Sequence, residues 1–159
     1  MKLINISLPL FLIAFSSCGD DHDHSEHSEN PNEEACEHMK DGPNKLFDAG
    51  ADPASATDTS ASDWKHTRVD LTLSANGDSF VGFVKYEASE AGDYLIFTST
   101  EATLKVAETD AESSQSVTDC SEVTHVQTFE LEIGEQVIEI STSSPSLSLV
   151  VEQSQSDTH

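Results

Sequence analysis

The chain has 159 residues and is strongly acidic: 30 Asp and Glu stand against 7 Lys and Arg, for a formal net charge of −23 at pH 7. Such a surface repels nucleic acids and anionic lipid headgroups, so we exclude DNA and RNA as partners and expect cations or basic proteins. The same acidity also suits a protein that only needs to stay soluble after export. The length fits one globular domain plus a tail.

The first eighteen residues, MKLINISLPLFLIAFSSC, combine one early cation, Lys2, with a mostly apolar stretch from Leu3 to Phe15. A membrane-spanning helix needs about twenty apolar residues, so we interpret residues 1–17 as a signal peptide. The ending FSSC resembles the lipobox of bacterial lipoproteins, although Phe15 stands where that family usually has an aliphatic residue. The resemblance implies that Cys18 carries palmitate-type acyl chains and anchors the protein in the cell envelope, at the periplasmic face or the outer membrane. The alternative is an ordinary secretory signal.

Residues 18–31 have no hydrophobic period, which is typical of a flexible tether. Three histidines lie there at spacings of two and three residues among carboxylates, and the candidate ligands are His22, Asp23, His24 and His27. Imidazole nitrogens with a carboxylate suit Zn²⁺, Cu²⁺ or Ni²⁺. The alternative is a solvated spacer in which the histidines are incidental.

A short helix is predicted next, from about residue 33 to 41. Asn32 can cap it, Glu33 and Glu34 lie near the positive end of its dipole, and Gly42-Pro43 ends it. We therefore assign residues 32–47 to a helical segment. Residues 48–63 are small, polar and acidic, which indicates a surface loop.

From residue 64 to 153 the hydrophobic period becomes two, and turn signals such as Asn76-Gly77 recur about every ten residues. This pattern predicts an all-β domain, an antiparallel β-sandwich of jelly-roll or Ig-like topology. Residues 154–159 are expected to be a disordered tail. The predicted strands cover 69–73, 80–87, 90–100, 102–108, 122–133, 136–141 and 146–152.

Two segments of this domain, EAGDYLIF and LEIGEQVIEI, resemble the repeating pattern of a strand, A-G-x-Y and a second strand in prepeptidase C-terminal domains. The resemblance covers roughly residues 66–152. It implies a small secreted β-sandwich with an accessory or binding role rather than an active site.

Of the three cysteines, lipidation would occupy Cys18, which leaves Cys36 and Cys120. In an oxidising envelope compartment we expect a disulfide between them. The closed loop would contribute roughly 4 to 5 kcal/mol in the chain-entropy estimate. The alternative, two thiolates that bind a metal, lacks the close CxxC spacing of zinc sites.

A second histidine set, His38, His66 and His125, falls in or beside the folded domain and could form a copper or zinc site if the three converged. On a helix, however, His38 is rotated about 200° from Cys36 and aligned with Glu34 one turn earlier. His125 shares strand parity with apolar neighbours, which is typical of a half-buried histidine. The alternative is therefore three separate surface or edge histidines.

No catalytic motif is present: the chain has no GxSxG, HExxH, glycine-rich phosphate loop or EF-hand sequence, and we do not expect an enzyme. We expect a lipid-anchored envelope protein whose tether captures or buffers Zn, Cu or Ni, with a metal transporter or another envelope protein as partner. The alternative is a non-catalytic module that binds a protein or glycan, with the tether as a spacer.

Overall fold

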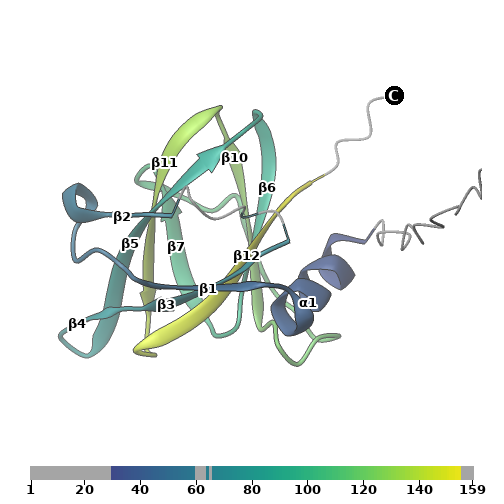
Figure 1. The fold of residues 1–159 in the computed structure, drawn as a ribbon, viewed down its shortest axis with the longest axis horizontal. Helices are drawn as coiled ribbons and strands as arrows, with labels where there is room; N and C mark the ends of the chain where they lie inside the picture. Colours follow the sequence, from purple (N-terminus) through teal and green to yellow (C-terminus); the bar gives the residue numbers. More distant parts are fainter. Residues whose placement is uncertain (1–29, 60–63, 65, 155–159) are drawn as a thin grey trace, which may run out of the picture.

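The computed structural model describes residues 30–59, 64 and 66–154, and Figure 1 shows their arrangement. The signal peptide, Cys18, the tether ligands His22, Asp23, His24 and His27, and the tail at 155–159 lie outside the described residues. The described part is mostly β: two six-stranded mixed sheets pack together, and one short helix, α1 (Pro31–Asp41), lies beside them. The predicted β-sandwich is therefore confirmed.

The first sheet has six strands. In spatial order they are β1 (Asn44–Asp48), β3 (Arg68–Thr72), β12 (Ser146–Gln153), β6 (Gly92–Thr98), β10 (His125–Leu131) and β9 (Ser113–Ser116).

The second sheet has five strands in one path and a sixth at its side. The path is β2 (Thr57–Asp58), β5 (Ser79–Ala88), β11 (Gly134–Thr142), β7 (Ala102–Val106) and β8 (Thr109–Asp110), and β4 (Ser74–Asn76) pairs with β5. Gly77, with φ of 65°, supplies the left-handed turn between β4 and β5.

Several boundaries differ from the sequence prediction. Residues 44–48, expected within the helical segment, form β1, and the predicted polar loop contains a 3-10 turn (Pro53–Ser55) and β2. Strand β1 pairs with β3 in parallel, and β2 pairs with β5 in parallel, so the sandwich is not wholly antiparallel. Both parallel partners are distant in sequence, and no local turn signal could reveal them.

The main core lies between the sheets and follows the period of two. Along β12, Leu147, Leu149 and Val151 face the second sheet, where Ile138 and Ile140 of β11 meet them, and all five are buried. Each such side chain contributes about 1.5 to 3 kcal/mol when it is fully buried.

Helix α1 covers the other face of the first sheet. Its Ala35 and Met39 pack with Phe97 of β6, Val123 and Val150 of β12 to form a second, smaller cluster. Val150 points to this face because it alternates with Leu149 and Val151 along the strand. No helix in the described ranges is long and apolar enough to span a bilayer.

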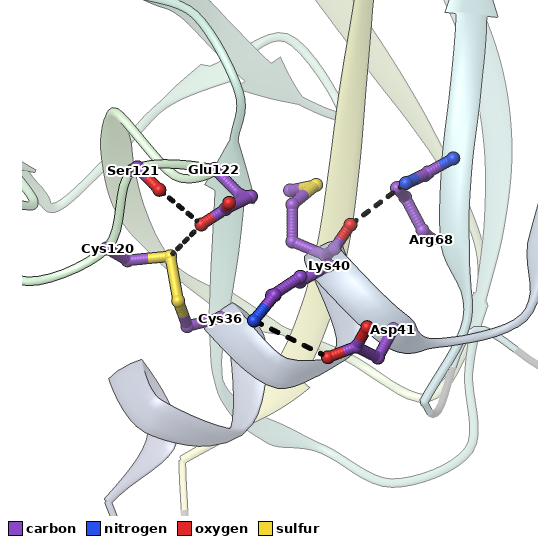
Figure 2. Close-up of a disulfide and its surroundings, with 8 residues drawn as sticks. Cys36, Lys40, Asp41, Arg68, Cys120, Ser121 and Glu122 are labelled. Atoms are coloured by element: carbon purple, nitrogen blue, oxygen red, sulfur yellow. Dashed lines mark hydrogen bonds and ion pairs between the residues drawn. A yellow bond between two sulfur atoms is a disulfide. The ribbon is translucent and has the colours of Figure 1, made fainter.

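The predicted disulfide is present: Cys36 of α1 is bonded to Cys120, with the two Cα atoms 5.9 Å apart (Figure 2). Cys120 lies in the segment before β10 and belongs to the small cluster, so the bond links the helix to the residues that it packs against. Its Sγ also lies 3.6 Å from Oε2 of Glu122.

Candidate metal centre

Helix α1 begins at Pro31, two residues before the start predicted from the sequence. Asn30, not Asn32, is the N-cap: its side chain accepts a hydrogen bond of 3.0 Å from the backbone N–H of Asn32, and Pro31 occupies the first helical position. The helix ends where the N–H of Gly42 donates to the carbonyl of His38 at 3.1 Å. Asparagine at the cap followed by proline is a strong start signal.

The three faces of α1 have different roles. With 3.6 residues per turn, Glu34 and His38 lie on one flank, Ala35 and Met39 form the stripe that packs on the sheet, and Cys36 lies about 200° around the axis from Glu34. The helix therefore carries a carboxylate and an imidazole, Glu34 and His38, on one flank and its disulfide on the other.

His66 reaches the same flank from the body of the protein. Strands β1 and β3 run parallel, with Asn44 opposite Arg68, so the helix before β1 and the turn before β3 emerge at the same end of the sheet. His66 has φ of 63°, a left-handed conformation in which histidine is enriched over most non-glycine residues. The neighbouring Trp64 is buried in the main core and donates from Nε1 to the carbonyl of Thr59 at 3.1 Å, which anchors this turn.

Four side chains meet at this place. Nδ1 of His66 lies 3.0 Å from Nε2 of His38 and 3.5 Å from Oε1 of Glu34. One ligand atom from each of Glu34, His38 and His66 lies within 4.8 Å of the others. On its second ring nitrogen, Nδ1, His38 is 2.8 Å from Oε1 of Glu152 on β12.

Glu152 fixes the ring orientation and the tautomer of His38. An ionised carboxylate only accepts, so Nδ1 of His38 donates to Glu152. In the neutral imidazole, Nε2 then carries the lone pair that faces His66 and Glu34. A carboxylate behind a histidine in this way orients the ring and raises its basicity as a metal ligand.

The separations suit a small metal ion. Two ligands at about 2.0 to 2.1 Å from tetrahedral zinc are about 3.3 Å apart. The observed distances of 3.0 Å and 3.5 Å from Nδ1 of His66 to its two neighbours bracket that value. The third separation, between His38 and Glu34, is within 4.8 Å, so an ion among two nitrogens and one oxygen would require the side chains to close around it.

The members of this group differ in exposure. The side chains of His38 and Glu152 are 10% and 9% exposed, that of Glu34 is 19% exposed, and that of His66 is 49% exposed. The carboxylate of Glu152 also acts on the core: burial chiefly raises the pKa of Tyr86, and the neighbouring Tyr94 and the charge of Glu152 raise it further. An ion at this group would lie between the buried His38 and the more exposed His66.

The structure places two of the three domain histidines together. The structure brings His38 and His66 together, but His125 lies at the start of β10, half-buried, and does not belong to the group formed by the described residues. Sequence reasoning aligned Glu34 with His38 without proposing it as a ligand, and it missed Glu152. Val150 could have indicated that Glu152 is buried. The two residues lie on the same face of β12, and an apolar residue on the outer face indicates that something covers it.

A second group contains Cys36, Cys120 and Glu122. Both sulfur atoms are joined in the disulfide, so neither is a thiolate that could coordinate an ion. The thiolate alternative does not apply to this oxidised form.

Comparisons with known proteins add little about function. No protein-family model matches the chain, and no curated protein matches it. Among solved structures, a β-glucosidase from Kluyveromyces marxianus is similar over 50% of this chain and 11% of its own length, with 12% identity and a TM-score of 0.37. The resemblance to prepeptidase C-terminal domains therefore remains an expectation.

Proposed function

We propose that this chain is a lipid-anchored protein of the bacterial cell envelope that captures a divalent transition metal, Zn²⁺, Cu²⁺ or Ni²⁺, at Glu34, His38 and His66. The observation that carries the proposal is that one ligand atom from each of two imidazoles and a carboxylate lies within 4.8 Å of the others, with Glu152 behind His38. The lipid anchor at Cys18 rests on the lipobox-like ending of the signal peptide.

The donor atoms define the class of metal. Imidazole and carboxylate ligands favour borderline cations, whereas Cu⁺ prefers sulfur ligands. Three protein ligands leave a coordination position for water or for a ligand from another molecule, as in zinc sites that exchange or react rather than only support a fold. The acidic surface adds a general attraction for cations.

The histidines of residues 18–31 have a supporting role in this proposal. His27 precedes Pro31 by four residues, which span at most about 14 Å when extended. The tether ligands would therefore raise the local concentration of metal near α1. Without a preformed arrangement their own affinity should be the weaker of the two.

Calorimetric titration of the full chain with Zn²⁺ and Cu²⁺ tests this division. Binding of about micromolar affinity or tighter is expected. Replacing both His38 and His66 with Ala should abolish the tight phase, and replacing His22, His24 and His27 with Ala should leave it. His125→Ala is the matched control, because His125 is also a partly exposed histidine of the domain. Tight binding that survives the loss of His38 and His66 would refute the domain site, and no heat with the unaltered chain would favour a metal-independent interaction module.

The anchor has its own test. Cells grown with labelled palmitate should incorporate label into the chain and lose it with Cys18→Ser. A protein without label that washes off membranes in plain buffer would contradict the lipid anchor.

A further inference from the structure

We propose that the Cys36–Cys120 disulfide is a redox latch on the metal centre: its reduction by a dithiol lowers the affinity for metal while the β-sandwich stays folded. This inference rests on the proposed function, because it concerns regulation of the same site. Two observations support it. The disulfide and the candidate ligands lie on opposite flanks of α1, and the small cluster under α1 is separate from the main core between the sheets.

The centre is divided between two bodies. Glu34 and His38 belong to α1, whereas His66 and the supporting Glu152 belong to the sheet and its preceding turn. The distances that matter, 3.0 Å and 3.5 Å from Nδ1 of His66 and 2.8 Å from His38 to Glu152, all cross from helix to body. Any displacement of α1 of about an ångström would therefore remove the match to a metal's short bonds.

The disulfide is the covalent link that holds α1 in register with the body on the flank opposite the ligands. Apart from it, α1 is held by Ala35 and Met39 in the small cluster and by a 3.0 Å hydrogen bond from Nη1 of Arg68 to the carbonyl of Met39. The contacts of the centre itself, His38 with Glu152 and His66 with His38 and Glu34, also join the helix to the body, and all of them lie on the flank away from the disulfide. An isolated helix of eleven residues is marginal in water, so α1 depends on its docking contacts. With one flank released, the helix can roll or lift on the contacts that remain.

The sandwich does not depend on this link in the same way. The main core between the sheets contains neither cysteine, and its strands pair with one another throughout. Loss of the disulfide lowers the free energy of unfolding of the whole domain through the opened loop, but the contacts that it removes directly lie in the small cluster beside the candidate centre.

A reductant can reach the bond. Cys36 is half-buried, and both cysteines line a groove of about 640 Å³ between α1 and the edge formed by β9 and β10. In the exchange a thiolate of the dithiol attacks one sulfur and its second thiol completes the reaction. The protein disulfide gains two electrons and two protons and becomes two thiols, and the dithiol becomes a disulfide.

The test uses the full chain in which His22, His24 and His27 are replaced by Ala, so that only the domain site is read. Co²⁺ and Zn²⁺ affinities are compared for the oxidised protein, for protein reduced with dithiothreitol and desalted without oxygen, and for C36S/C120S. The latch predicts a loss of affinity of about tenfold to a hundredfold in the last two, the range seen when supporting groups of a metal site are removed. Near-ultraviolet circular dichroism of Trp64 reports whether the sandwich is still folded.

Ile138→Ala is the matched control, because it destabilises the main core without touching α1 and should leave metal affinity unchanged. Unchanged affinity in folded C36S/C120S would overturn the latch and leave the proposed function standing. Tighter binding by the reduced protein, with sulfur-to-cobalt charge-transfer absorption, would also overturn it, since the thiols would then be ligands themselves. No binding by the oxidised protein would overturn the proposed function and the latch together.

Discussion

The two faces of the first sheet are built differently. On the inner face, alternating apolar side chains of β12, β6 and β3 meet those of β5, β7 and β11 in the second sheet. On the outer face, α1 covers only a small apolar cluster, and beside this cluster lie a buried Glu152, a buried His38 and the disulfide. The inner face is an apolar core, whereas part of the outer face is occupied by buried polar side chains.

The proposed function offers a reason for this difference. Buried charged or polar side chains cost free energy unless they are paired, so a Glu–His pair under a short helix is a poor means of stabilisation. A metal site, with three of these side chains as ligands and Glu152 as the support, would explain why they lie together. Changes on the inner face should therefore affect stability, and changes on the outer face should affect metal affinity.

The largest expected effect is on stability at the inner face. Ile138 is fully buried on β11, and Ile138→Ala should lower the free energy of unfolding by about 2 to 5 kcal/mol, because it removes apolar contacts and leaves a cavity. Denaturant unfolding followed by circular dichroism measures this. Ile138→Val should cost only about 0.5 to 1.5 kcal/mol. A loss below 1 kcal/mol for the alanine variant would show that this core is not closely packed.

The next effect is on metal affinity at the outer face. Glu152→Ala should weaken Zn²⁺ binding by about tenfold to a hundredfold although Glu152 is not itself a ligand, because His38 loses its orienting acceptor. Glu152→Gln keeps an acceptor and should lose less. Glu130 on β10 is exposed, and Glu130→Ala is the control for a simple loss of negative charge. Equal weakening by both alanine variants would mean that Glu152 acts only through long-range charge.

A smaller effect concerns the start of α1. Asn30→Ala should cost about 1 kcal/mol of stability, since the first turn loses its side-chain acceptor. Asn32 lies exposed within the helix, and Asn32→Ala should be neutral or slightly stabilising because alanine has the higher helix propensity. Denaturant unfolding of the two variants decides which asparagine is the cap. The reverse order would restore the assignment made from the sequence.

The smallest effect is a dependence on pH at Asp70 of β3, the strand next to the edge of the first sheet. Partial burial raises the pKa of Asp70, but hydrogen bonds from Ser148, Asn44 and Arg68, with the charge of Arg68, outweigh it and hold the pKa below the usual 3.8. The folded state therefore favours the ionised form, and this stabilisation is present above pH 3.8 and is lost as the pH falls through the lowered value.

Asp70→Asn should therefore reduce stability by up to about 1 kcal/mol at neutral pH, as expected for a partly exposed ion pair. The difference from the unaltered chain should shrink in acid. Urea unfolding between pH 7 and pH 3 measures it, and a difference that stays constant over this range would contradict the pairing.

The sequence predicted the sandwich because its signals are local. Alternation along residues 146–152 and the Asn76-Gly77 turn depend on nearest neighbours, and so does the Gly42-Pro43 end of α1. The disulfide followed from counting cysteines in an oxidising compartment, without any geometry.

The candidate centre could be predicted only in part. That Glu34 and His38 share a flank follows from helical spacing, but His66 joins them through the parallel pairing of β1 with β3, which no turn signal encodes. His125 lies at the start of β10 and does not join the group, because strand pairing and not sequence order decides which side chains meet. Glu152 was missed since a glutamate near the end of a strand ordinarily faces solvent.

The most direct test of the central claim is anomalous diffraction at the zinc absorption edge from crystals of the oxidised protein grown with Zn²⁺. We expect one strong peak bonded to Nε2 of His38, Nδ1 of His66 and a carboxylate oxygen of Glu34, at about 2.0 to 2.2 Å from each. A peak elsewhere, or an unchanged contact between His38 and His66 with no ion beside it, would contradict it.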